Sequence, residues 1–280
     1  MEESAKESAV LSAQLSPTRG RAAVVHELRR LLSVRESLDQ GLGRNGSDKI
    51  LPFGLAALDD RLPQGGLPCA ALHEVVPATE AALPAAFGFV VALLTRLART
   101  YPLIFVLPAY GRRRHGRLSA HGLNSLGLDP SRAVMVEPAR RNETLWAMAE
   151  AVRSAAPQAV VGAIDKLDLK TSQKLHLAAT DAKLPLLLLR PANTLEASAA
   201  ATRWRIGTAP AARDRFGAYA QPRWHLQLER CRNGRPGEWV VEYDHVAHRF
   251  SLATALADPS FSRDAGVDAD GRACRHAGRS

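Results

Sequence analysis

The chain has 280 residues, with 37 Lys and Arg against 28 Asp and Glu, and a formal net charge of +9. Its 46% apolar and 23% charged residues are typical of a globular protein and exclude a disordered or fibrous one. The first twenty residues hold no apolar block of signal-peptide length. The longest apolar run, 81–94, is shorter than the ~18–20 residues that cross a bilayer. The three cysteines are far apart and lack metal-ligand spacing, so we expect a cytoplasmic protein without a membrane segment or bound metal.

We expect the first 46 residues to form a flexible leader and an amphipathic helix outside the main domain. Residues 1–20 are polar, whereas 21–40 place apolar side chains near helical spacing. Glycine-rich residues 41–47 end this helix and form a linker. The apolar stripe packs on the chain's own domain or binds a partner, and its candidate partner-binding residues are Val24, Leu28, Leu31 and Leu32.

Residues 47–255 alternate short apolar strands with helices. The expected strands are 70–76, 103–107, 133–137, 159–164 and 184–189, and the expected helices are 81–100, 118–126, 142–155 and 171–182. This order predicts an α/β domain with a mostly parallel β-sheet flanked by helices on both faces. Two alternating segments, 224–230 and 238–244, predict a C-terminal antiparallel β-hairpin at the sheet edge. Residues 256–280 have almost no apolar side chains, and we expect them to be disordered.

The turn after the first of these strands lacks the features of a phosphate-binding loop. Residues 77–84 contain neither glycine nor lysine, and Glu80 adds a negative charge where a phosphate would bind. Asp165 follows the 159–164 strand, where a magnesium-binding acid would lie, but without the loop we interpret it as a capping or turn residue. These residues form a degenerate nucleotide site, which consists of Pro77, Thr79, Glu80 and Asp165. We expect no cofactor and no catalytic residue.

Arginines are concentrated in two stretches of the domain. No acid lies between Glu80 and Asp129, and from 203 to 235 eight arginines face only Asp214 and Glu229. Such basic stretches favour contact with nucleic acid, although a solvated basic surface is the alternative. The candidate DNA-binding residues are Arg112, Arg113, Arg114, Arg203, Arg205, Arg223, Arg230 and Arg232. On a strand, Arg203 and Arg205 share one face while Trp204 points the other way, where it packs in the core or serves as a platform on which a base stacks.

Several blocks of the sequence resemble a known family. Residues 51–59, the Gly65-Gly66-Leu67-Pro68 run and the His73-Glu74-Val75 strand resemble the entrance to the RecA ATPase core. With three later blocks, 167–179, 198–206 and 223–240, the pattern is similar to the ImuA family over about residues 21–255. The resemblance implies a RecA-like core and a role in SOS-induced, error-prone translesion synthesis.

The resemblance also implies partners. It points to a non-catalytic accessory subunit that bridges DNA, single-stranded or primer-template, to an ImuB-type Y-family polymerase homologue and an error-prone replicative-type DNA polymerase. Such a protein would be associated with the nucleoid, and self-association stays open. The loop after the 184–189 strand is shorter than in RecA, at about 193–201. Two alternatives are a DNA-stimulated ATPase with a non-standard nucleotide site and a SulA-like cell-division inhibitor.

Overall fold

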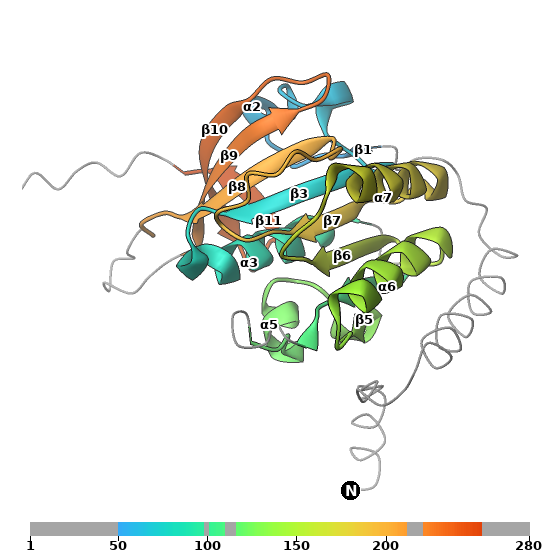
Figure 1. Cartoon of the computed structure of the whole chain (residues 1–280). Coiled ribbons are helices and arrows are strands. Elements are labelled where there is room, and N and C mark those ends of the chain that lie inside the picture. The colour runs from blue at the N-terminus through green and yellow to red at the C-terminus, as the bar shows by residue number, and fades with distance from the viewer. Residues whose placement is uncertain (1–49, 98–100, 110–115, 212–220, 254–280) are drawn as a thin grey trace, which may run out of the picture.

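The computed structural model describes residues 50–97, 101–109, 116–211 and 221–253 (Figure 1). Three of the predicted regions lie outside the described residues: the apolar stripe from Val24 to Leu32, the Arg112–Arg114 run and the tail 256–280. Within the described ranges, no helix is long and apolar enough to cross a membrane.

The domain is built on a nine-stranded sheet in the order β11-β10-β9-β8-β3-β7-β6-β4-β5. The parallel strands are β3 (Leu72–Pro77), β4 (Leu103–Val106), β5 (Ala133–Val136), β6 (Ala159–Ala163), β7 (Leu186–Leu189) and β8 (Thr202–Thr208). The antiparallel strands are β9 (Arg223–Cys231), β10 (Gly237–Asp244) and β11 (Arg249–Leu252). The mostly parallel sheet and the C-terminal hairpin at its edge are therefore confirmed.

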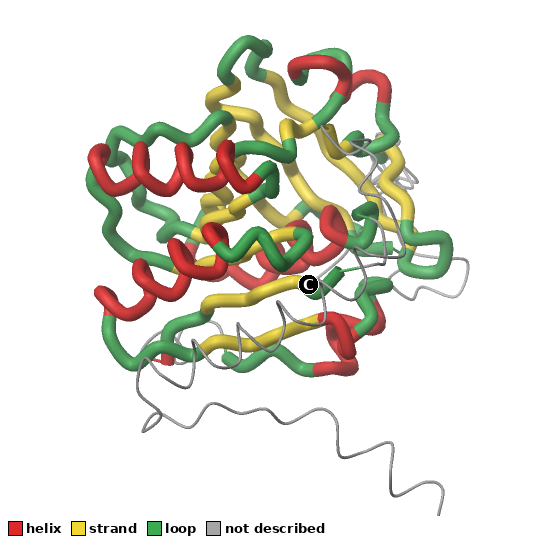
Figure 2. Tube along the Cα trace, turned by 90° about the vertical axis from the view of Figure 1, so that its right-hand side faces the viewer, coloured by secondary structure: helices red, strands yellow, loops and turns green. Residues whose placement is uncertain are grey.

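Helices cover both faces of the sheet, as Figure 2 shows. One face packs on α3 (Leu83–Leu94), and the other packs on α6 (Arg141–Arg153) and α7 (Leu169–Ala182). The smaller elements are β1 (Ile50–Leu51), α2 (Ala56–Asp59), η2 (Pro63–Gly65), β2 (Leu67–Pro68), η3 (Glu80–Ala82), α5 (Ala120–Ser125) and η5 (Pro130–Arg132). The apolar pattern overestimated the length of α3, which was predicted over 81–100. Leu97 is buried in the turns that follow Leu94, so it continues the apolar pattern without being helical.

Aromatic side chains fill the core between α3 and the antiparallel half of the sheet. The rings of Phe53 and Trp204 lie 5.3 Å apart, and that of Phe89 lies 6.2 Å from Trp204 and from Trp224. Trp204 is only 1% exposed, which confirms its predicted place in the core. Because side chains alternate along β8, the burial of Trp204 turns Arg203 and Arg205 to the opposite face.

Candidate functional site

The parallel strands end at one edge of the sheet, where open α/β folds bind their ligands. Pro77 ends β3 and Asp165 follows β6, so both of these predicted nucleotide-site residues lie at this edge. Arg190, which was not predicted, follows β7 at the same edge. Thr79 precedes η3 without a side-chain cap. Glu80 Oε1 accepts a hydrogen bond of 3.2 Å from the backbone N–H of Ala192, so this carboxylate joins the β3–α3 turn to the segment after β7.

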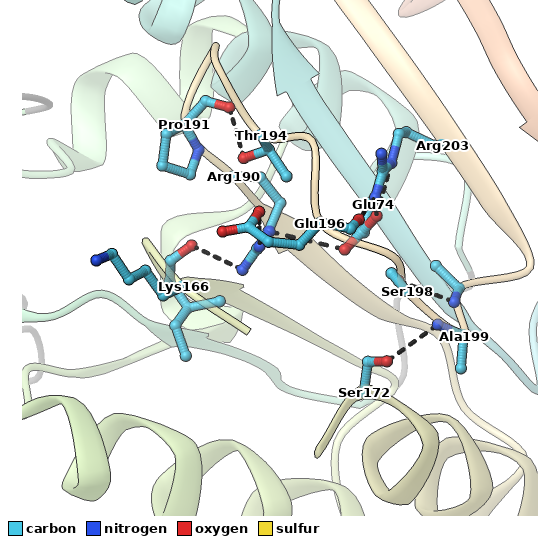
Figure 3. Close-up of polar contacts among 12 residues, drawn as sticks. Glu74, Lys166, Ser172, Arg190, Pro191, Thr194, Glu196, Ser198, Ala199 and Arg203 are labelled. Carbon is cyan, nitrogen blue, oxygen red and sulfur yellow. Dashed lines mark hydrogen bonds and ion pairs between the residues drawn. The ribbon is translucent and has the colours of Figure 1, made fainter. Parts of the chain in front are cut away.

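A buried ionic cluster lies beside this edge and was not identified from the sequence (Figure 3). The Glu74 side chain is fully buried in the middle of β3, and the Arg190 side chain is 1% exposed. Arg190 Nε lies 3.6 Å from Glu74 Oε1, and Arg203 Nε donates to Glu74 Oε2 at 2.8 Å. The signal that could have revealed the cluster is an acid inside a mostly apolar strand, because a buried acid needs a cationic partner.

Arg190 is held by further acceptors. Its Nη2 donates to Glu196 Oε2 at 3.1 Å and its Nη1 donates to the carbonyl of Ile164 at 3.3 Å. Burial lowers the pKa of Arg190, and the charges of Glu74 and Glu196 oppose that shift. Among the described residues, neither Arg190 Nε nor Glu74 Oε1 has a hydrogen bond of its own. The attraction between these two atoms is therefore electrostatic, over 3.6 Å.

Arg203 and Arg205 fasten the segment 190–201, which connects β7 to β8. Arg203 Nη2 donates to the carbonyl of Glu196 at 2.8 Å, and Arg205 Nη1 donates to the carbonyl of Ala192 at 3.1 Å. Arg205 also forms a close ion pair with Glu229 on β9. Both guanidinium groups thus have intramolecular partners on the face where a DNA contact was predicted.

Arg230 and Arg232 hold the far end of the same segment from β9. Arg230 Nη2 donates to the carbonyl of Ala200 at 3.0 Å, and Arg232 Nη2 donates to that of Ala199 at 3.3 Å. Arg232 Nη1 lies 3.2 Å from Nε2 of His176 on α7. The side chain of Arg232 is exposed, unlike that of Arg230, which is half-buried.

Arg223 at the start of β9 is buried, and its Nη2 lies 3.5 Å from Glu242 Oε2 on β10. The five predicted DNA-binding arginines in the described ranges therefore lie on β8 and at the two ends of β9, each with a partner within the chain. Their role in DNA binding stays a prediction.

The two ends of the segment that carries Arg112–Arg114 are fixed next to each other. The N–H of Ala109 donates to the carbonyl of Pro138 at 2.9 Å, and Arg117 Nη2 lies 3.7 Å from Glu137 Oε2. Both contacts lie at the carboxyl end of β5, so the described residues that flank the arginine run, Ala109 and Arg117, lie at the ligand-binding edge of the sheet.

His73 is buried on β3 in a chain of hydrogen bonds. Its Nε2 donates to the carbonyl of Pro68 at 2.7 Å, which leaves Nδ1 to accept from the Thr202 hydroxyl at 2.8 Å. The Thr202 oxygen in turn accepts from Trp204 Nε1 at 3.0 Å. Burial lowers the pKa of His73 to about 4, so the ring is neutral. Among the residues that the structure describes, no cluster of His, Cys, Asp or Glu could hold a metal ion.

Comparison with known proteins identifies relatives in sequence and neighbours in structure. Protein ImuA of Caulobacter vibrioides strain NA1000 / CB15N is 34% identical over 228 residues, covering 75% of this chain and 91% of that protein. Protein ImuA of strain ATCC 19089 / CIP 103742 / CB 15 matches to the same extent. The crystal structure of the RadB recombinase superposes with a TM-score of 0.50 at 15% identity, covering 73% of this chain and 100% of that one, and confirms the RecA-like core. No protein-family model matches the chain.

Proposed function

The chain belongs to the ImuA family, and from this membership we propose that it is a non-catalytic accessory subunit of the damage-induced mutagenesis machinery. In this role it bridges DNA, an ImuB-type inactive polymerase homologue and an error-prone replicative-type polymerase during translesion synthesis. The observation that carries the proposal is the 34% identity to Protein ImuA, which extends over 91% of that relative. DNA contact would place the protein at the nucleoid.

The geometry of the β3–α3 turn supports a non-catalytic role. A phosphate loop wraps phosphates with backbone amides and a lysine. In this chain, Pro77 and Pro84 lack amide donors, and the Glu80 carboxylate takes the Ala192 N–H at the same edge. A nucleotide phosphate would meet a like charge there instead of donors.

The proposed DNA contact by Arg112–Arg114 is supported by the charge of the run and by its described neighbours, Ala109 and Arg117, which lie at the ligand-binding edge. Phosphate contacts by arginine release counterions and make binding salt-dependent. Replacing Arg112, Arg113 and Arg114 together by glutamine should weaken oligonucleotide binding and lower its salt slope. An unchanged salt slope would place the DNA contact elsewhere.

Deletion of the gene for this chain tests the function directly. We expect damage-induced mutagenesis to be lost after ultraviolet irradiation while undamaged growth is normal, and a complementing copy should restore it. A deletion strain that mutates at the wild-type rate would contradict the proposal. Phosphate release that is stimulated by single-stranded DNA and lost in Asp165→Ala would support the ATPase alternative instead.

Pull-down with the two polymerase partners tests the bridging role. We propose that the stripe of Val24, Leu28, Leu31 and Leu32 docks a partner. A chain that lacks residues 1–46 should then lose that partner, whereas a chain that lacks 256–280 serves as the matched truncation. Retention of both partners by the first truncation would contradict this assignment.

A further inference from the structure

Three basic side chains meet where the end of β9 packs against α7. Arg232 Nη1 lies 3.2 Å from His176 Nε2, and Arg232 and Arg230 donate to the consecutive carbonyls of Ala199 and Ala200. His176 belongs to the middle of α7 and was not predicted to be a binding residue. The chemistry of this contact depends on which nitrogen of the His176 ring carries the proton.

The backbone of β3 fixes that proton. Leu72 is fully buried, and its N–H donates to Nδ1 of His176 at 3.3 Å. A buried amide without an acceptor is costly, so Nδ1 must keep its lone pair. The neutral ring therefore carries its proton on Nε2, which faces Arg232.

Arg232 and His176 therefore turn hydrogen-bond donors toward each other. A guanidinium group only donates hydrogen bonds, and Nε2–H is also a donor. Two donors 3.2 Å apart cannot bond to each other, and protonation of the ring would add a second positive charge. A water or anion oxygen that lies to one side of the two nitrogens, within hydrogen-bond reach of both, can accept from both.

The surrounding charges favour an anionic acceptor. Burial and then the Arg232 charge lower the pKa of His176, while burial and then Arg203 lower the pKa of Arg230. Glu74 opposes the shift at Arg230, but this carboxylate is already paired with Arg203. Arg230 Nε is buried and has no hydrogen-bond partner among the described residues. The cluster thus carries more positive charge than its neighbouring acid balances.

We propose that a phosphate group binds beside His176 and Arg232, with one phosphate oxygen accepting from both Nε2–H and Nη1–H. The exposed Arg232 and the partly exposed His176 leave this position open to solvent. A nucleic-acid backbone or a free phosphate can supply the group. Binding of a nucleic-acid backbone rests on the DNA contact of the proposed function. The phosphate site itself does not depend on that contact.

Nuclear magnetic resonance of the full chain tests the site without DNA. Long-range proton–nitrogen spectra of the nine histidines report the protonated ring nitrogen, and His176→Asn assigns the His176 signals by their disappearance. We expect the Nε2–H form, and inorganic phosphate should shift its Nε2 signal in a saturable way. In Arg232→Gln the phosphate shift should be lost. A His176 protonated on Nδ1, or a signal that phosphate leaves unchanged, would overturn the proposal.

Two matched variants separate the inner and outer contacts of His176. Asparagine places its oxygen near the position of Nδ1, so His176→Asn keeps an acceptor for Leu72 but removes the outer donor. Glutamine places its amide nitrogen near Nε2, so His176→Gln keeps the outer donor. Phosphate binding should therefore be lost in His176→Asn and retained in a folded His176→Gln. Equal loss in both folded variants would count against the proposed atoms.

A fluorescent oligothymidine binding assay identifies the source of the phosphate. Arg232→Gln should weaken binding about five- to tenfold and lower the salt slope by about one. Arg249→Gln removes the same charge from an exposed position on β11 and should leave the affinity within about twofold of the wild type. A phosphate-induced shift at His176 with unaltered oligothymidine binding would support the site and assign it to free phosphate. If oligothymidine binding is unaltered in Arg232→Gln and phosphate does not shift the His176 Nε2 signal, the proposed phosphate site is overturned. DNA contact elsewhere on the chain would still be possible in that case.

Discussion

Neutralising Glu74 is the sharpest test of the buried ionic cluster. Glu74→Gln keeps the shape of the side chain but removes the charge that faces both Arg190 and Arg203. The remaining carboxylate near Arg190 belongs to Glu196, whose side chain is 44% exposed and well solvated. The variant therefore leaves a buried guanidinium group without its buried counter-charge.

The expected cost follows from the burial of both partners. Removing one member of a buried ion pair typically costs about 3–5 kcal/mol, because the other charge stays desolvated. Glutamine still accepts one hydrogen bond from Arg203, so we expect the lower end, about 3 kcal/mol. For a domain of this size, such a change lowers the melting temperature by roughly 6–12 °C.

Urea unfolding followed by circular dichroism measures this cost. Glu150→Gln is the matched control, because Glu150 forms an exposed pair with Arg153 one turn away on α6, and its loss should cost under about 0.5 kcal/mol. The difference in unfolding free energy between the two variants should persist in about 1 M salt, because buried ion pairs are poorly screened. If Glu74→Gln unfolds at the same urea concentration as Glu150→Gln, the reasoning from burial is refuted.

Three other sites give further predictions that the same unfolding assay can check. Burial lowers the pKa of His73 to about 4 from its usual 6.5, so the neutral ring stabilises the fold fully above pH 6.5, and about 3 kcal/mol of stability is lost as the pH falls from 6.5 to 4. His73→Asn should flatten this pH dependence of stability. An equal slope in the variant and the wild type would contradict the prediction. Gly162→Ala would place a Cβ atom 2.0 Å from Met148 Sδ in a fully buried contact between β6 and α6, and it should cost about 1–3 kcal/mol. Ser172→Ala removes the buried acceptor of the Ala199 N–H at 3.0 Å and should cost about 1–3 kcal/mol.

The fold was predictable because its signals are local. Strands such as β4 and β7 are continuous apolar runs of a few residues, and their alternation with helices predicts a parallel sheet with two covered faces. The burial of Trp204 followed from side-chain alternation along one strand. The helix α3 ended earlier than predicted because hydrophobic periodicity reports burial, and buried turns follow Leu94.

The ionic contacts were not predictable because they join distant parts of the chain. Arg203 and its partner Glu74 are separated by 129 residues, and no local pattern relates them. The charges between residues 203 and 235 suggested a basic stretch with few acids to neutralise its arginines. The balancing acid comes from β3, since parallel pairing places Glu74 directly opposite Arg203.

Arg203 and Arg232 look alike in the sequence, yet their acceptors give them different chemistry. Arg203 donates to a buried carboxylate and to a carbonyl, so its charge is neutralised inside the chain and its loss would be felt as instability. Arg232 donates one N–H to the Ala199 carbonyl and turns another N–H toward the protonated nitrogen of His176. A net charge of +9 therefore says little about where a polyanion binds. The relevant quantity is the number of guanidinium and imidazole donors that lack an acceptor among the described residues. Just after β9, Arg232 Nη1 and His176 Nε2 are two such donors that face each other.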